Sequence, residues 1–467
     1  MAKTKPDRTR PADPARRRPP ARWADPSVLV VQAAVVGVAV VVGAVLNHRR
    51  VPIHADAAPL FATWLPHVGP GTPLAVAIAA LGVYRGPDWA ARLPWRRLMI
   101  GGYLTALAWT LSLALIDGWS RGLATRLTPQ AEYLHDVPKV TGIPALISQF
   151  ASHILDFRPG SWATHVAGHP PGAFLIFVLL NRLGLGGGGP AALACVLIGA
   201  CAPVAVAVTL RALRDEPAAR AALPFLVLFP GAVWVGASAD GLFTGVVATG
   251  LALLAVGRWW PAVAGGLLLG FSLYLSYGLV LVGPLALAVI LLKPHHRWVT
   301  GAVGVAGVGV VVAAFSTAGF WWLTGYHLVV QRYYQGWAAD RPYGYWVWAN
   351  LACLVVSAGP AAVPALRRAA AAAIDRWRHQ AHRPPDDLPG TGAHTSPAFW
   401  LPALALLAIT AADLSGLSKA EVERIWLPYE IWLLPAIAWL PAAHHRCWLA
   451  VQALTALTIN HLLLTDW

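Results

Sequence analysis

Residues 28–46, VLVVQAAVVGVAVVVGAVL, form an apolar run that contains no charged side chain. A helix needs about 20 such residues to cross the hydrocarbon core of a membrane. Comparable runs recur along the chain, among them 98–116 and 190–210, and only 12% of all residues are charged. Soluble domains carry about twice that share. We therefore predict an all-α fold, a polytopic transmembrane helical bundle with about 11 to 13 spans.

Lysine and arginine give the chain a formal net charge of +14. They gather beside or between the apolar runs, in residues 1–23, 91–97 and 367–385. Basic loops next to membrane helices mark the cytoplasmic side, so topology explains the charge and nucleic-acid binding is not indicated. We expect a multi-pass protein of the cell membrane with a cytoplasmic N-terminus.

The alternation of apolar and basic segments predicts the parts of the chain and the side on which each loop lies. Residues 325–345 are expected outside, and we expect the active site on that face. The expected parts are a disordered basic cytoplasmic tail (1–26), two N-terminal membrane helices (27–97), a core (98–345) with an outer loop (117–170), and C-terminal membrane helices (346–467) with a cytoplasmic loop (367–397) and an outer loop (414–426).

Three apolar stretches, 171–185, 190–210 and 221–237, follow the outer loop. Only an even number of crossings returns Asp240 to the outer side, where the basic loops of the C-terminal half place it. One of the three stretches is therefore expected to enter the membrane without crossing it. The sequence leaves open which one.

Acidic side chains outside the basic loops fall on the predicted outer side. Carboxylates at membrane depth are costly and mark functional sites by default. Asp117 ends the apolar run 98–116, which makes it the expected general base for a hydroxyl group delivered at the membrane surface. Asp56, after the first predicted helix, is the alternative base. The acids on this side are Asp56, Asp117, Glu132, Asp136, Asp156, Asp240, Asp340, Asp413, Glu421, Glu423 and Glu430.

Two short motifs in and after the outer loop supply further candidates. AEYLHDVP (131–138) combines acids with aromatic rings, and HVAGHPPG (165–172) sets two histidines before a double proline. Proline is tolerated in the first turn of a helix but not in its interior, so the prolines are expected to start the next helix and to hold the histidines at the aqueous rim, facing the loop that begins with Asp117. The candidate rim residues are Glu132, Tyr133, Asp136, His165, His169 and Asp240.

These side chains suit hydrogen bonds to phosphate or sugar hydroxyl groups, and a divalent metal remains an alternative. No pair has a diagnostic ligand spacing such as HExxH. We therefore assign no metal ligand and no cofactor.

Two segments combine arginine, aromatic rings and acids: QRYYQGWAADRPYGYW (331–346) and KAEVERIWLPYE (419–430). Aromatic belts are common at membrane interfaces. Arginine is also the residue best suited to bind phosphate through two parallel hydrogen bonds. The candidates for binding the phosphate or the lipid of a donor are Arg332, Arg341, Tyr343, Glu423 and Arg424.

The order of these elements resembles the GT-C superfamily of membrane glycosyltransferases, such as the protein O-mannosyltransferases and the aminoarabinose lipid A transferases. The similarity covers residues 98–260: a helix ending in Asp117, a long outer loop with an acid-tyrosine pair, and HPPG at the next helix. By this resemblance Asp117 takes the position of the catalytic acid, Asp240 that of the second acid, and His169 to Gly172 that of the HPP element.

The resemblance implies an inverting enzyme that uses a polyprenyl-phosphate-linked sugar, a hexose such as mannose or a pentose. The acceptor would be a cell-envelope glycan, glycolipid or protein on the outer face. A multi-pass transporter or lipid flippase is the alternative, although such proteins place polar residues at the bilayer midplane and repeat their halves. A scaffold protein in envelope assembly is a third hypothesis, but it would give no function to the polar and charged clusters on the outer side.

Overall fold

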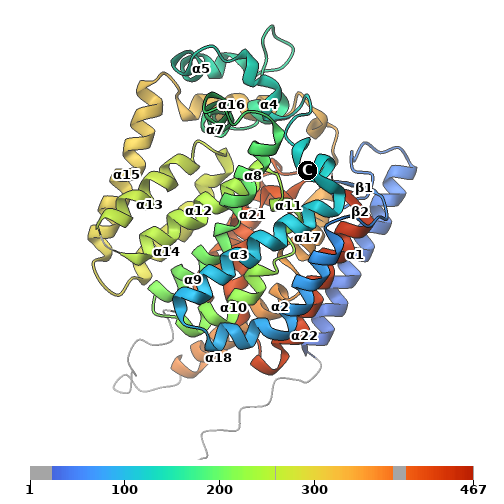
Figure 1. Cartoon of the computed structure of the whole chain (residues 1–467), viewed down its shortest axis with the longest axis vertical. Coiled ribbons are helices and arrows are strands. Elements are labelled where there is room, and N and C mark those ends of the chain that lie inside the picture. Colours follow the sequence, from blue (N-terminus) through green and yellow to red (C-terminus); the bar gives the residue numbers. More distant parts are fainter. Residues whose placement is uncertain (1–23, 258, 382–395, 466–467) are drawn as a thin grey trace, which may run out of the picture.

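The computed structural model describes residues 24–257, 259–381 and 396–465. These residues form a bundle of helices with one pair of short strands (Figure 1), which confirms the predicted all-α class. The predicted tail falls almost wholly outside the described residues, as do positions 382–395 of the predicted loop 367–397, whereas α18 covers the first part of that loop.

The helices that build the body of the bundle are α1 (Ala24–His48), α2 (Thr72–Arg92), α3 (Trp95–Ala114), α8 (Gly188–Gly199), α9 (Cys201–Ala212), α10 (Glu216–Val227), α12 (Ala239–Val256), α13 (Trp259–Ser272), α14 (Gly283–Leu292), α15 (Arg297–Thr317), α17 (Tyr343–Ala358), α18 (Ala362–Ala381), α19 (Pro397–Leu414) and α22 (His445–Leu462). Shorter helices connect them or cover one end: α4 (Tyr133–Asp136), α5 (Ile143–Gln149), α6 (Thr164–Ala167), α7 (Pro171–Arg182), α11 (Ala232–Val235), α16 (Trp322–Tyr333), α20 (Val422–Ile425) and α21 (Leu427–Glu430). The strands are β1 (Ala62–Trp64) and β2 (Leu463–Thr465), which pair antiparallel with Ala62 opposite Thr465.

Six described helical segments are long and apolar enough to cross a membrane, or seven if α17 and α18 form one bent span. Apolar stretches such as Pro171–Arg182 and Tyr277–Leu292 form shorter helices. The count therefore falls below the about 11 to 13 spans expected from the sequence, because several apolar runs fold as helices shorter than a bilayer requires. The six are Asp25–His48, Trp95–Asp117, Gly188–Ala212, Ala239–Val256, Arg297–Thr317 and Pro397–Leu414.

Helix α7, formed by the first of the three apolar stretches, is too short to cross a membrane. It has 12 residues and is about 18 Å long at 1.5 Å per residue, against about 30 Å of hydrocarbon. In Figure 1 it lies at the upper end, beside α4 and α16. Of the two following stretches, Gly188–Ala212 runs from this upper end to the lower one, and α10 with α11 runs back. Asp240 therefore lies at the same end as α7.

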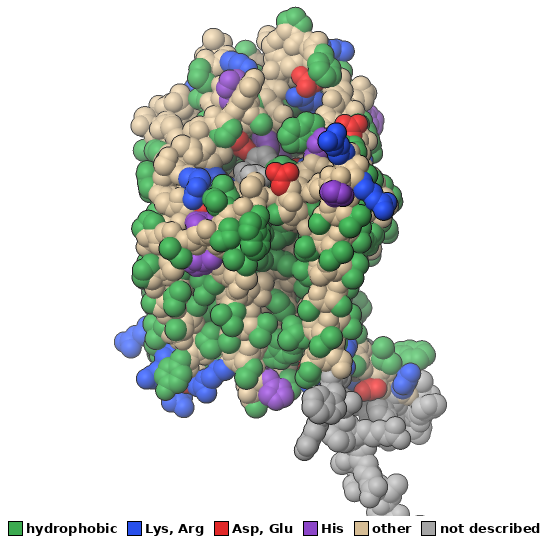
Figure 2. Space-filling model, turned by 90° about the vertical axis from the view of Figure 1, so that its right-hand side faces the viewer, with side chains coloured by type: hydrophobic (Ala, Val, Ile, Leu, Met, Phe, Trp, Pro, Cys, Tyr) green, Lys and Arg blue, Asp and Glu red, His purple; other side chains and the backbone are tan. Residues whose placement is uncertain are grey.

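The two ends of the bundle differ in charge. On the face shown in Figure 2, hydrophobic side chains cover the middle and lower parts, acidic side chains lie mainly in the upper part, and lysine and arginine lie both at the lower edge and beside the acids in the upper part. The acids therefore concentrate at one end, whereas basic side chains occur at both. We call the end with α4, α5 and α16 the acidic end, and the opposite one the basic end.

Residues 117–170 fold into a compact cap over the acidic end. Asp136 is fully buried, and its carboxylate accepts a hydrogen bond from Lys139 Nζ (2.5 Å) and another from the Ala163 backbone N–H (2.6 Å). Arg332 Nη1, from α16, lies 2.5 Å from Asp156 Oδ2. The long loop expected from the sequence is thus held in place by carboxylates that bind its own backbone and α16.

We expect the replacement Asp136→Ala to loosen this cap. Loss of charge-assisted hydrogen bonds to a buried carboxylate costs about 1.5–3 kcal/mol each, so the midpoint of thermal unfolding in detergent should fall clearly. Asp340→Ala is the matched control, because the Asp340 side chain is 62% exposed. Equal midpoints for the two variants would contradict the proposed role of Asp136.

Candidate functional site

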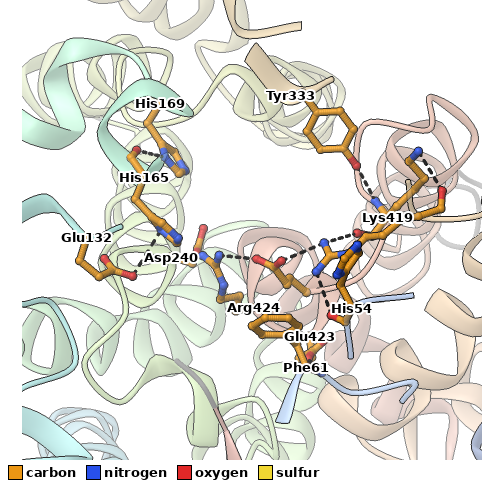
Figure 3. Close-up of polar contacts among 12 residues, drawn as sticks. His54, Phe61, Glu132, His165, His169, Asp240, Tyr333, Lys419, Glu423 and Arg424 are labelled. Atoms are coloured by element: carbon orange, nitrogen blue, oxygen red, sulfur yellow. Dashed lines mark hydrogen bonds and ion pairs between the residues drawn. The ribbon is translucent and has the colours of Figure 1, made fainter. Parts of the chain in front are cut away.

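A chain of ion pairs runs through the buried acidic end, from Asp240 to Arg341 (Figure 3). Arg424 Nη1 donates to Asp240 Oδ2 (2.6 Å), and its Nη2 donates to Glu421 Oε2 (2.8 Å). Arg341 Nη1 donates to Glu421 Oε1 (2.9 Å). Buried charges are tolerated when each one finds an opposite charge and good hydrogen-bond geometry. The network therefore joins α12, α20 and the segment before α17.

The backbone on both sides of the network orients these groups. Asp240 lies in the first turn of α12, where Ser238 Oγ accepts a hydrogen bond from the Gly241 N–H (3.1 Å) and caps the helix. Ala420 and Glu421 have φ angles of 70° and 63°. This left-handed conformation costs about 1–3 kcal/mol per residue when glycine is absent, and such strain gathers at functional sites. It places the Glu421 carboxylate between two guanidinium groups.

Glu132 borders the same network from the cap. Its Oε1 lies 3.5 Å from His165 Nδ1. Burial raises the pKa of the Glu132 carboxyl from 4.5 to about 7, the positive charge of Arg424 opposes the shift, and the negative charge of Asp240 adds to it. Burial also lowers the pKa of His165 well below 6.5, so its ring is neutral. A carboxyl whose pKa lies near neutrality can take or give a proton at physiological pH.

The HPPG motif sets the position of the second histidine. Pro171 is the first residue of α7, as predicted. A Cβ atom on Gly172 would lie 2.6 Å from the Tyr274 carbonyl oxygen, so only glycine allows this approach. The ring of His169 lies next to Tyr133, with 2.9 Å between Nδ1 and the hydroxyl oxygen.

The predicted position of the histidines needs correction. The His165 side chain is buried and His169 is half-buried, so neither stands at an open aqueous rim. Their nearest ionisable and phenolic partners are Glu132 and Tyr133, which belong to the loop that begins with Asp117. The reason is that the cap folds back over them: the His165 N–H donates to the Ala131 carbonyl (2.9 Å).

Lys419 and Tyr333 extend the network on the side of Arg341 (Figure 3). Lys419 Nζ donates to the Arg341 carbonyl oxygen (3.1 Å), and the Lys419 N–H donates to the Tyr333 hydroxyl (3.0 Å). The ammonium lies 5.5 Å from the centre of the Tyr334 ring, within range of a cation–π interaction. Burial lowers the pKa of Lys419, so this cation is incompletely solvated.

Glu423 lies on α20 but faces away from these cations, towards the loop that carries β1. Its Oε1 accepts a hydrogen bond from the Phe61 N–H (2.7 Å). Burial raises its pKa to about 7. Its predicted contact with a donor phosphate stays a prediction.

A small pocket lies beside Asp240. Its cavity volume is about 40 Å³, which leaves room for a few water molecules and is far below the roughly 300–1,000 Å³ of small-molecule sites. Its walls are mainly apolar: Phe243, Leu279, Leu281, Ala412, Ile425, Trp426, Pro428 and Tyr429 line it together with Ser276, Gly278 and Ser418. An apolar ligand tail would fit beside the carboxylate-guanidinium pair only after these walls move apart.

Asp117 belongs to a separate cluster. His67 Nε2 lies 2.7 Å from Asp117 Oδ1, and Arg126 Nη2 donates to Oδ2 (3.1 Å). His67 Nδ1 lies 2.7 Å from the Leu65 carbonyl oxygen. The ring therefore lies between the Leu65 carbonyl and the Asp117 carboxylate, and these contacts hold both side chains in place.

Glycine residues bring His67 to this position. Cβ atoms on Gly69 and Gly71 would lie 1.9 Å from the Ile116 carbonyl oxygen and 2.0 Å from that of Ser112. The loop before α2 thus packs backbone against backbone on the end of α3. Arg126 also donates to the carbonyl oxygen of Thr465 in β2, so distant parts of the chain meet around Asp117.

The structure brings most of the predicted residues together and leaves a few apart. One network and its border contain Glu132, Tyr133, His165, His169, Asp240, Arg341 and Arg424. Four predicted residues lie elsewhere: Asp117 in its own cluster, Asp136 in the cap, Arg332 against Asp156, and Tyr343, whose hydroxyl donates to the Leu414 carbonyl (3.3 Å). Asp56, the alternative base, is exposed.

Sequence reasoning missed the roles of Lys419, Glu421 and Tyr333, although all three stand in the two segments singled out for their arginines. It also missed His67 and Arg126, for which the sequence carries no local signal. Within the described ranges, no three His, Cys, Asp or Glu side chains group in a way that could hold a metal ion.

Comparison with known proteins found no match to this chain among protein-family models, curated proteins or solved structures. The function is therefore inferred from the geometry of these two clusters.

The raised pKa of Glu132 predicts a pH dependence of stability. The folded protein holds this proton more tightly than the unfolded chain. The contribution of Glu132 to the free energy of unfolding is therefore complete below pH 4.5 and is lost as the pH rises to about 7. The loss amounts to about 3 kcal/mol by the usual conversion. Glu423, whose pKa is also about 7, contributes with the same sign.

Glu132→Gln should flatten the fall of the unfolding midpoint between pH 5 and pH 8, measured in detergent. Glu423→Gln should remove the other part of the slope. An unchanged slope in Glu132→Gln would show that this carboxyl does not hold its proton in the folded protein.

Proposed function

We propose that this chain is an integral membrane glycosyltransferase that transfers a sugar from a polyprenyl-phosphate donor to a cell-envelope glycan, glycolipid or protein on the outer face. The observation that carries the proposal is the Arg341–Glu421–Arg424–Asp240 network, which lies at the edge of an apolar pocket at the acidic end. The order of Asp117, the long loop and HPPG, similar to that of the GT-C superfamily, adds support.

The charges around this network favour an anionic ligand. Arg341, Arg424 and Lys419 supply three positive charges, and Asp240 and Glu421 supply two negative ones. Glu132, with a pKa of about 7, adds little negative charge below that pH. The balance of three minus two leaves one positive charge for a phosphodiester group, which arginine and lysine bind through charge-assisted hydrogen bonds.

The pocket beside Asp240 suits the apolar part of such a donor. Trp426 and Tyr429 give it flat aromatic walls, and Phe243 and Leu279 complete them. A lipid-linked donor would place its phosphate at Arg424 and its first isoprenoid unit against these walls, which would have to move apart to admit it. The donor would then approach from the membrane and the acceptor from the outer face.

The proposed reaction needs a carboxylate base and no oxidant or reductant. The acceptor hydroxyl gives its proton to the carboxylate, its oxygen bonds to the anomeric carbon, and the bond between that carbon and the phosphate oxygen breaks. Polyprenyl phosphate leaves with the bonding electrons. Binding of its charge by Arg341 and Arg424 would stabilise the transition state.

We propose Asp117 as the base, and Glu132 is the alternative. His67 and Arg126 engage one lone pair on each oxygen of Asp117, which leaves one lone pair on each for a hydroxyl group. Glu132 has the advantage of a pKa near 7 and lies at the network itself. The two assignments make different predictions for single substitutions.

A lipid flippase or transporter is the second candidate function, favoured by Glu430. Its side chain is fully buried, Oε1 accepts from Ser357 Oγ (2.8 Å), and Oε2 has no hydrogen-bond partner within the described part of the chain. Acids inside a helical bundle are typical of proton-coupled transport. Movement of a lipid-linked sugar across proteoliposomes without its consumption would favour this function.

We expect Asp117→Asn to lower kcat by about 10²–10⁴-fold, the usual contribution of a general base, while KM for the donor stays nearly constant. The assay follows the consumption of polyprenyl-phosphate sugars by reconstituted protein. Asp56→Asn is the matched control and should retain activity, because Asp56 is exposed.

Full activity of Asp117→Asn would remove Asp117 from the mechanism. A loss confined to Glu132→Gln would assign the base to Glu132 instead. If the wild-type protein consumes no lipid-linked sugar from a panel of hexose and pentose donors, the glycosyltransferase proposal fails.

Lys419→Met should weaken donor binding rather than chemistry. Loss of one charge-assisted contact to phosphate costs about 1.5–3 kcal/mol, so KM for the donor should rise at least about tenfold, with kcat changed less. Lys139→Met is the matched control, because Lys139 pairs with Asp136 in the cap. Equal KM values for the two variants would exclude Lys419 from the donor site.

A further inference from the structure

Helix α18 leaves the bundle at the basic end by a sharp bend. Its axis makes an angle of 99° with that of α17. Gly359, at the break, has a φ of 94°, and a Cβ atom there would lie 2.7 Å from the Gln452 side chain. The Pro360 carbonyl accepts a hydrogen bond from Gln32 Nε2 of α1 (3.2 Å). The bend is thus fixed by packing, so α17 and α18 do not form one straight span.

Two arginines of α18 show its depth in the membrane. Arg367 Nη2 and Arg368 Nη2 lie 2.5 Å and 2.6 Å from the Asp25 carboxylate. Asp25 is the first residue of the candidate span Asp25–His48. The first third of α18 therefore lies at the level where α1 enters the hydrocarbon. Because α18 is nearly perpendicular to α17, its second half continues along the membrane surface.

The second half of α18 has one face packed on the protein and one face uncovered. Arg376 lies over the Trp439 ring at 5.0 Å, which fixes the packed face. Ile374 and Trp377, three residues apart and thus neighbours on a helix, have exposed fractions of 50% and 69%. Arg378 is exposed next to them, and so is Asp375.

We propose that this uncovered face of α18 lies in the headgroup region of an anionic leaflet. Ile374 and Trp377 would enter the boundary between headgroups and acyl chains, and Arg378 would contact lipid phosphates. An aromatic and an aliphatic side chain flanked by arginine is the pattern of helices that lie in a membrane interface. The arginines of α18 outnumber its single acid, Asp375, so the charge complements anionic rather than zwitterionic lipids.

This proposal is independent of the glycosyltransferase proposal, because it concerns the opposite end of the molecule. It assigns α18 to the membrane surface, instead of joining it with α17 in a seventh span. It also assigns a lipid requirement to the protein: the four arginines of α18 outnumber Asp375 and Asp25, so a leaflet without anionic headgroups would leave this excess positive charge uncompensated.

The test measures the depth of residue 377 in vesicles. The full chain carries Trp377→Cys labelled with an environment-sensitive fluorophore, in a background in which Cys447, which is exposed, and Cys201, which is half-buried, are serine. Vesicles contain phosphatidylcholine with or without phosphatidylglycerol, and either lipid carries the quenching spin label. Identical leaflets make the orientation of insertion irrelevant. Phe157→Cys, 82% exposed at the other end, is the control site.

We expect spin-labelled lipid to quench the fluorophore at 377 and not the one at 157, with phosphatidylglycerol quenching more than phosphatidylcholine. Arg378→Gln should lower this preference by about fivefold, the equivalent of about 1 kcal/mol for one basic residue near an anionic surface. Asp375→Cys serves as a second labelling site on the same turn. Quenching at 377 by aqueous iodide but not by lipid would overturn the surface location, and equal quenching by both lipids would overturn the anionic preference.

Discussion

Arg424 donates one hydrogen bond to Asp240 and another to Glu421, and the acidic end depends on this pair of contacts. It joins the first turn of α12 to the short helix α20, and Glu421 extends it to Arg341. Removing one partner from a buried ion pair leaves an unpaired charge, at a cost of about 3–5 kcal/mol. The strained backbone at Ala420 and Glu421 persists because this network holds it.

The fold class followed from the sequence because a run such as 28–46 has few other ways to bury its side chains. The number of spans did not, since hydropathy along the chain does not show where a helix stops. The stretch after HPPG is apolar enough to cross, yet α7 ends after 12 residues. It ends just before a glycine-rich segment, where Gly184 has a φ of 78°, the left-handed conformation typical of helix ends.

The types of residue in the candidate site could be predicted from the sequence, but which of them pair with one another could not. The sequence named Asp240, Arg341 and Arg424, which lie in one network, whereas the carboxylate between the two arginines, Glu421, takes its place through a backbone conformation that no local pattern predicts. The contact of Asp117 with His67 could not be predicted from the sequence for another reason. His67 belongs to a loop fifty positions upstream, and glycines that permit close contact brought it there.

The pairing of β1 with β2 has a consequence for how the molecule is made. Arg126, which binds Asp117, also binds Thr465, and Thr72 lies 2.9 Å from His461. The surroundings of Asp117 are therefore complete only after residues 461–465 have been synthesised and α22 has joined the bundle. During translation the helices insert one after another, from the N-terminal side onwards. The Asp117 cluster would then stay open until residues 461–465 have been synthesised and have joined it.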